Sequence, residues 1–178
     1  TAVGAVPLPM DQLGIDILIA GSQKAFMLPT GLSFISFSQK AWQAVENSKL
    51  PNFYLDLIAE KAANEKGQTR VSSSVSLIRG LDAALQIMLE PALTQHLAGI
   101  EKLALATRKG GEALGLKIFP ETPSPSLTVF KLPTDVDGEK IRQHLESEYN
   151  VTVMGGQDRL KGKILRIGHM GYIPDEDA

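Results

Sequence analysis

Apolar residues fall into short, dense runs near the start of the chain. The run at residues 15–20 is β-branched and apolar almost throughout, which is typical of a strand that is covered on both faces. A second run at residues 32–37 predicts another strand, with proline and glycine in the turn between the two. Ser38 then stands where the N-cap of a helix over residues 40–45 is expected.

From Ser74 onward the apolar residues recur at helical spacing. The first long helix is ended or kinked at Glu90–Pro91, because proline cannot continue the backbone hydrogen bonds of a helix. A second helix is predicted over residues 94–113, with Gly115 as its stop signal. The polar stretch at residues 60–68, which precedes both helices, is expected to be a mobile loop that extends from the fold.

The last third of the chain predicts a different order of elements. After a proline-containing turn, the pattern predicts a strand at 127–132, a helix at 138–148, a short strand at 151–154, a Gly–Gly turn and a strand at 163–167. This order is typical of a compact α+β subdomain. We place the domain boundary inside the long helix, with residues 1–95 in one domain and residues 96–178 in the other.

Composition and charge exclude several classes of function. The 178 residues are 43% hydrophobic and 21% charged, as in an ordinary soluble domain. A formal charge of −2 gives no electrostatic footprint for nucleic acid or an anionic membrane, and the longest apolar run is far too short to span a bilayer. The chain has no cysteine, which excludes disulfides and fits a cytoplasmic location. No targeting segment is recognised.

Lys24 is the first candidate for chemistry. It follows the predicted buried strand and is flanked mainly by small residues, and ligands bind at the strand ends of α/β sheets. A lysine that is desolvated there has a lowered pKa, and a neutral amine is the nucleophile that Schiff-base chemistry requires. On spacing alone, a lysine that extends from a strand end into solvent explains the same position.

Arg166 is the second candidate. It interrupts an apolar strand, where alternation puts its side chain on the face opposite Leu165 and Ile167. A guanidinium is suited to binding a planar carboxylate through paired hydrogen bonds. The alternative is an arginine on the solvated face of a half-buried strand.

The histidines receive no role from the sequence. His169 follows Arg166 closely enough to be considered as a base, but a lone histidine beside a turn is more often structural. His96 and His144 are left unassigned as well. The Gly–Gly pair predicts a turn without the signature of a phosphate loop, and no metal-ligand spacing is present in the sequence.

Two motifs together carry a resemblance to a known family. The run Gly21–Ser22–Gln23–Lys24–Ala25, followed by Pro29 and Gly31, resembles the cofactor-lysine motif of class V pyridoxal-phosphate (PLP) aminotransferases. The likeness extends through Gly14–Ile15–Asp16, residues 75–85 and Met154–Gly155–Gly156 to the run Lys161–Gly168. It is closest to the alanine–glyoxylate and serine–glyoxylate (serine–pyruvate) aminotransferases, a group that also carries the label of soluble hydrogenase small subunit.

The resemblance implies a role for each matching residue. It implies that Lys24 holds PLP as a Schiff base and then carries the proton of amino transfer, and that Gln23 helps to hold the cofactor phosphate. Arg166 matches the residue that binds the substrate α-carboxylate. Thr69 matches a position that reaches across a homodimer to the phosphate of the partner's PLP, although Arg70 stands here where the family often has proline.

The resemblance also implies that this chain is the carboxy-terminal half of a longer protein. The upstream half of a family member carries a phosphate loop, an aromatic residue that stacks on the cofactor and an aspartate that pairs with the pyridine nitrogen. We therefore expect part of an α/β fold of PLP-dependent fold type I. Residues 1–95 would complete the mixed-sheet large domain, and residues 96–178 would form the small α+β domain.

The activity that the resemblance implies is transfer of the amino group of alanine or serine to glyoxylate or another 2-oxo acid, with this chain inactive by itself. The nearest enzyme alternative is a class V lyase such as a cysteine desulfurase. Many of those enzymes use a mobile catalytic cysteine, which this chain lacks. The alternative from a different class is a fragment without catalytic activity that serves only in interactions.

Overall fold

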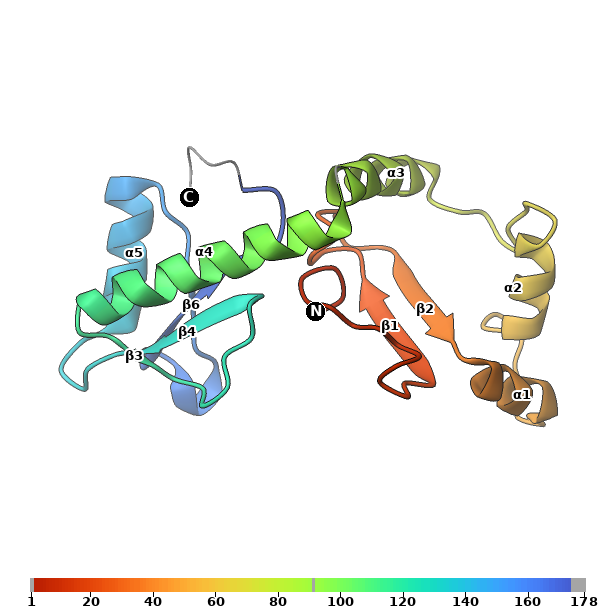
Figure 1. Ribbon diagram of the computed structural model, residues 1–178, viewed down its shortest axis with the longest axis horizontal. Coiled ribbons are helices and arrows are strands. Elements are labelled where there is room, and N and C mark those ends of the chain that lie inside the picture. The colour runs from red at the N-terminus through yellow and green to blue at the C-terminus, as the bar shows by residue number, and fades with distance from the viewer. Residues whose placement is uncertain (1, 91, 174–178) are drawn as a thin grey trace. The chain divides into compact units, whose positions relative to one another are not determined.

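A computed structural model describes residues 2–90 and 92–173, and Figure 1 shows the elements along the chain. The chain forms two compact units. The first holds Leu8–Ile87, and the second holds Ala2–Pro7 together with the described part of Met88–Ala178. The domain boundary placed between residues 95 and 96 stays a prediction.

The first unit contains a β-hairpin followed by helices (Figure 1). Its elements are β1 Ile17–Gly21, β2 Ser33–Phe37, α1 Gln39–Asn47, α2 Leu57–Asn64 and α3 Val75–Leu89, the last of which continues into the second unit. Strands β1 and β2 pair antiparallel, with Ile19 opposite Ile35. Both strands predicted near the start of the chain are therefore confirmed.

One face of the hairpin differs from the expectation that the first strand is covered on both sides. Ala20 is buried, but Ile17 and Ile19 are 50% and 63% exposed. Successive side chains of a strand point to opposite faces, so these two isoleucines share a face with Ile35, which is also exposed. The difference arises because no described residues pack over this face of the two-stranded sheet.

Side-chain caps start α1 and α2. The Oγ of Ser38 accepts a hydrogen bond of 3.1 Å from the N–H of Ala41, which confirms the predicted N-cap of α1. Asp56 caps α2 in the same way through the N–H groups of Ile58 and Ala59. Since α2 extends to Asn64, the prediction of a mobile loop over residues 60–68 is wrong for residues 60–64.

The second unit is built on a four-stranded antiparallel sheet with the strand order β3-β4-β6-β5. Its elements are α4 Leu93–Ala113, β3 Lys117–Ile118, β4 Leu127–Lys131, α5 Gly138–Tyr149, β5 Met154–Gly155, the 3-10 helix η1 Asp158–Leu160 and β6 Ile164–Gly168. The predicted strand–helix–strand–strand order is confirmed. The sequence did not predict β3 or η1, because elements so short show no periodicity.

Helix α4 lies along β4 and β3, and α5 lies against β5. Ile100 and Ala104 of α4 are buried, as are Phe130 and Leu165 of the sheet. The ring of Phe130 lies so close to Gly111 of α4 that it leaves no room for a Cβ atom there. This close approach fixes the helix on the sheet. Within the ranges that the structure describes, no helix is both long and apolar enough to cross a membrane.

Candidate functional site

Lys24 lies in the loop between β1 and β2, and Ser22 fixes that loop. Ser22 is fully buried. Its Oγ donates to the carbonyl oxygen of Pro29 at 2.7 Å and accepts from the N–H of Leu32 at 3.3 Å. Its backbone N–H donates to the carbonyl of Leu32 at 3.1 Å, and its own carbonyl accepts from the N–H of Leu28 at 3.1 Å. Both ends of the loop are thus tied to one buried residue.

Helix α3 packs on the same loop through glycines. A Cβ atom on Gly31, whose φ is +140°, would lie 2.7 Å from the Cδ1 of Leu77 on α3. A Cβ atom on Gly80 of α3 would lie 2.8 Å from the Cδ2 of Leu28 in the loop. Because these two positions carry no side chain, the helix and the loop approach closely enough to hold the backbone around Lys24 in place.

The side chains of Lys24 and Gln23 are exposed on this loop. The carboxamide of Gln23 folds back over Gly21, where a Cβ atom would lie 2.7 Å from its Oε1. Met27, whose N–H donates to the carbonyl of Lys24 at 3.0 Å, has a left-handed φ of 59°, and such strain is concentrated at functional sites. The burial that the sequence predicts around the Lys24 amine is not supplied by the described residues.

Thr69 is exposed in the loop that joins α2 to α3. Its neighbour Arg70 donates from Nη1 to the carbonyl oxygen of Tyr54 at 3.1 Å, and the guanidinium carbon lies 5.7 Å from the centre of the Phe53 ring. Arg70 therefore ties the Thr69 loop to the segment before α2. That segment is apolar and exposed, since Phe53, Tyr54 and Leu55 all face solvent.

Arg166 lies in the middle of β6, in the second unit. It is paired with Val129 of β4 on one side and with Met154 of β5 on the other. Its Nε donates to the carbonyl oxygen of Gly155 at 2.7 Å. The terminal nitrogens Nη1 and Nη2 form no hydrogen bond within the described part of the chain. The guanidinium is thus anchored at its base with its outer end available to a ligand.

Arg166 lines a cavity of about 500 Å³ together with residues of the turn that leads into β6. Those residues are Gly156, Gln157, Asp158, Arg159, Leu160 and Ile164. Gly156 has no room for a side chain, because a Cβ atom there would overlap the carbonyl group of Leu160. Two guanidinium groups and a single carboxylate line this cavity, so its chemistry suits an anion.

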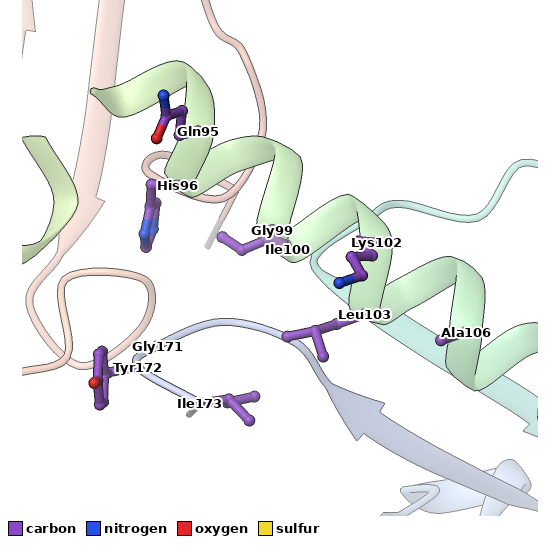
Figure 2. Close-up of a pocket in the computed structure, with 10 residues that line it drawn as sticks. All are labelled: Gln95, His96, Gly99, Ile100, Lys102, Leu103, Ala106, Gly171, Tyr172 and Ile173. Carbon is purple, nitrogen blue, oxygen red and sulfur yellow. The ribbon is translucent and has the colours of Figure 1, made fainter. Parts of the chain in front are cut away.

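A larger cavity of about 620 Å³ lies along α4. Figure 2 shows His96 and Leu103 projecting from α4 on the side where Gly171, Tyr172 and Ile173 run. The Nε2 of His96 is buried without a hydrogen-bond partner in the described part of the protein. None of the residues predicted from the sequence as site residues lines this cavity.

The structure brings Gln23 and Lys24 together in one loop, and Thr69 lies in the same unit. Arg166 belongs to the second unit. Sequence reasoning gave no part to Ser22, although a serine directly after a buried strand is a signal that its hydroxyl ties down a turn. It also missed Gly155, which contributes through its backbone carbonyl and shows no side-chain signal.

The comparisons with known proteins agree with one another. The family model "Aminotransferase class-V" matches residues 1–170. The chain is 38% identical over 179 residues to a soluble hydrogenase small subunit of a Synechococcus species and 40% identical over 182 residues to an uncharacterized aminotransferase of Methanocaldococcus jannaschii. It is 35% identical over 181 residues to a serine–glyoxylate aminotransferase of Methylorubrum extorquens.

These alignments cover 99%, 100% and 97% of this chain but 46%, 47% and 45% of the relatives. The chain therefore spans about half the length of the curated relatives it matches.

Solved structures confirm the expected fold. An aspartate aminotransferase of subgroup IV from Thermus thermophilus matches with a TM-score of 0.89 and 29% identity, over 99% of this chain and 50% of that chain. An alanine–glyoxylate aminotransferase from a Nostoc species matches with a TM-score of 0.86 and 28% identity, over 97% of this chain and 47% of that chain. The prediction of a partial α/β fold of PLP-dependent fold type I is therefore confirmed.

Proposed function

The chain belongs to the class V aminotransferase family, and from that premise we propose that the whole protein moves the amino group of alanine or serine to glyoxylate or another 2-oxo acid. Pyridoxal 5′-phosphate is the cofactor of this family. The observation that carries the proposal is the loop held by Ser22, which presents the side chains of Gln23 and Lys24 beyond the end of β1.

The residues of this loop fit the cofactor. An exposed primary amine on a fixed backbone suits an aldehyde, and the carboxamide of Gln23 offers N–H donors to a phosphate. When bound, PLP supplies an electron sink for the charge that develops at the substrate α-carbon. Lys24 would hold the cofactor aldehyde through Nζ. Its amine, when free, would take the proton from the substrate α-carbon and later return it as a general acid.

Arg166 binds the α-carboxylate of the substrate in this proposal. Because Nε is committed to the carbonyl of Gly155, the two terminal nitrogens remain to form paired hydrogen bonds with the two carboxylate oxygens. The anion-suited cavity that Arg166 lines supports this role. Two hydrogen bonds to one carboxylate fix the orientation of the bound amino acid as well as its affinity.

Thr69 and the homodimer form a further part of the proposal. The exposed hydroxyl of Thr69 is suited to donate to the phosphate of the partner subunit's cofactor. The exposed apolar segment with Phe53, Tyr54 and Leu55, which Arg70 ties to the Thr69 loop, supports an interface there, since exposed apolar patches mark sites of association. The active unit is then a two-fold dimer with sites built from both subunits.

The chain is proposed to be part of a longer cytoplasmic protein and to be inactive by itself. The chain spans about half the length of its relatives, which supports a longer protein. The lyase alternative is disfavoured because many class V lyases rely on a catalytic cysteine, and this chain has none. The alternative of a non-catalytic interaction fragment predicts that the whole protein shows no amino transfer.

A screen of amino donors and acceptors tests the proposal. The whole protein, loaded with PLP, is incubated with alanine, serine, aspartate or cysteine in the presence of glyoxylate or pyruvate, and 2-oxo acid and amino acid products are measured. We expect the fastest transfer from alanine or serine to glyoxylate. Formation of alanine from cysteine in a control without any 2-oxo acid would establish the lyase instead, and no turnover with any pair would favour the interaction fragment.

A further inference from the structure

A buried histidine closes the pairing between β4 and β6, and the proposed function gives it no role. His169 follows β6 directly and is 2% exposed. Its backbone N–H donates to the carbonyl of Ser126 at 3.1 Å, just beyond the last strand pair, Leu127–Gly168. Its Nε2 lies 2.8 Å from the Oγ1 of Thr128, which is 0% exposed. The ring of His169 thus holds Thr128 of β4, and its backbone holds Ser126, which directly precedes that strand.

The surroundings of the ring favour its neutral form. Burial lowers the pKa of His169 below its ordinary value, and the guanidinium of Arg108 on α4 lowers that pKa further. Arg108 is itself held in place by a hydrogen bond of 2.6 Å from Nη2 to the carbonyl of Ser124. From β4, the ring faces the hydroxyl of Thr128. Protonation would put a second positive charge into this buried cluster.

The same strand pair carries Arg166. Thr128 is paired with Ile167, and the next pair is Val129 with Arg166. The bond between Thr128 and His169 therefore lies next to the ladder position that sets the backbone of Arg166. On the opposite side of β6, the Nε of Arg166 is anchored on β5. The strand that carries this guanidinium is held from both sides.

Among the described residues, His169 is also the last that is hydrogen-bonded to the sheet or to the residue that precedes β4. Beyond it, Gly171, Tyr172 and Ile173 line the cavity along α4 (Figure 2). Strand ends fray where backbone and side-chain hydrogen bonds are lost. Without the bond to Thr128, the end of β6 is held to β4 only by its backbone pairing, and Arg166 lies three residues before His169.

We propose that His169 is a positioning residue for Arg166: by binding Thr128 it holds the end of β6 against β4 and so keeps the outer nitrogens of the Arg166 guanidinium in one direction. The inference rests on the proposed role of Arg166 in binding the substrate carboxylate. His169 itself contacts neither substrate nor cofactor in this role. Its effect is on the binding of the amino acid and the 2-oxo acid, and not on the chemistry at Lys24.

Two matched pairs of variants in the whole PLP-loaded protein test this inference. His169→Leu removes the hydrogen bond, whereas His169→Gln keeps a polar side-chain nitrogen. Thr128→Val removes the hydroxyl at constant shape, whereas Thr128→Ser keeps it, so this pair tests the bond even if His169→Leu does not fold. We expect the Leu and Val variants to raise KM for the amino donor about three- to tenfold, the factor for one neutral hydrogen bond. Their kcat should stay within about twofold, because the proton transfer at Lys24 is untouched.

Rescue and pH dependence separate positioning from a loss of general stability. The Gln and Ser variants should restore KM to within about twofold of the unmodified protein. In the unmodified protein the neutral ring persists down to the lowered pKa of His169, so KM should rise as the pH falls through that value. The Gln variant, which does not titrate, should lack this rise. Substitution of the exposed His144 by Gln is the control and should change none of these quantities.

The outcomes distinguish this inference from the proposed function. An unchanged KM in both the Leu and Val variants would overturn it, as would Gln and Ser variants that are impaired as strongly as Leu and Val. A fall in kcat or PLP content at constant KM would overturn it too. If Arg166→Lys weakens substrate binding while the His169 variants are normal, only this inference fails. If Arg166→Lys leaves substrate binding unchanged, the proposed function fails at that residue.

Discussion

The Nε of Arg166 donates a hydrogen bond of 2.7 Å to the carbonyl oxygen of Gly155 on the neighbouring strand. A Cβ atom on Gly155 would lie 2.8 Å from the Oε1 of Glu139 on α5, so a side chain there would require the Glu139 carboxylate to move. Glu139 is in turn paired with Arg142 at 2.9 Å. The hydrogen bond that anchors Arg166 therefore depends on the position of the Gly155 carbonyl, next to which α5 packs.

The first prediction concerns this anchored guanidinium. Arg166→Lys in the whole protein keeps the positive charge but loses the paired geometry. We expect amino-acid binding to weaken by on the order of 1.5–3 kcal/mol, the scale of a hydrogen bond to a charged group. Binding is measured by titration with the amino donor, and the absorbance of bound PLP should stay intact. Unchanged substrate affinity together with loss of PLP would assign Arg166 to the cofactor or the fold.

The second prediction concerns the packing of α4 on the sheet. Gly111→Ala places a methyl group against the ring of Phe130 and should destabilise the protein by about 1–3 kcal/mol. Gly110→Ala is the matched control, since no atom lies within 4 Å of a Cβ there. Alanine at that helical position should stabilise by about 0.5–1 kcal/mol. Urea unfolding of the three proteins measures both effects, and equal stabilities would contradict the packing.

The third prediction concerns sites shared between subunits. Thr69→Val should weaken PLP binding, and Lys24→Ala should abolish the covalent link. When the two variants are mixed and allowed to exchange subunits, each hybrid dimer should regain one site in which both residues are intact. Activity of the mixture should exceed the sum of the separate variants. No gain on mixing, or a fully active monomer in sedimentation, would show that Thr69 does not serve the partner subunit.

The pattern of the chain predicts much of the fold because most of its elements are locally encoded. Ser38 caps α1 as a serine before a helix should, and α3 ends at Leu89, before the break predicted at Glu90–Pro91, of which Pro91 lies outside the described residues. The Lys24 loop was recognised from its motif. Its rigidity was not foreseen, because it depends on the packing of α3 on the loop, which no local pattern reveals.

The unforeseen parts of the candidate site depend on partners far away in the sequence. His169 meets Thr128 across a separation of 41 residues, and its burial also depends on α4. Gly155 acts through a carbonyl oxygen that every residue possesses. The first strand shows the opposite case. Its sequence has the pattern of a strand that is buried on both faces, but the described residues leave the face with Ile17 and Ile19 exposed.

The fourth prediction concerns the 178-residue chain expressed by itself. By its resemblance to the family, it has the lysine and the arginine but not the aspartate, the stacking aromatic residue or the phosphate loop of the upstream half. Without the pyridine-nitrogen partner the cofactor is a poor electron sink. We expect no transamination of alanine and glyoxylate with added PLP. Turnover close to that of the whole protein would mean that the site is built from other residues.

The fifth prediction is that Lys24 carries the cofactor, and it is tested by reducing the PLP-loaded whole protein with borohydride and mapping the labelled peptide. The exposed amine on the loop fixed by Ser22 should hold the pyridoxyl group, so the label should lie on Lys24. Lys24→Ala should remove it, whereas Lys40→Ala, at an exposed lysine of the same unit, should leave it in place. A label on any other lysine of the unmodified protein would contradict the assignment of Lys24.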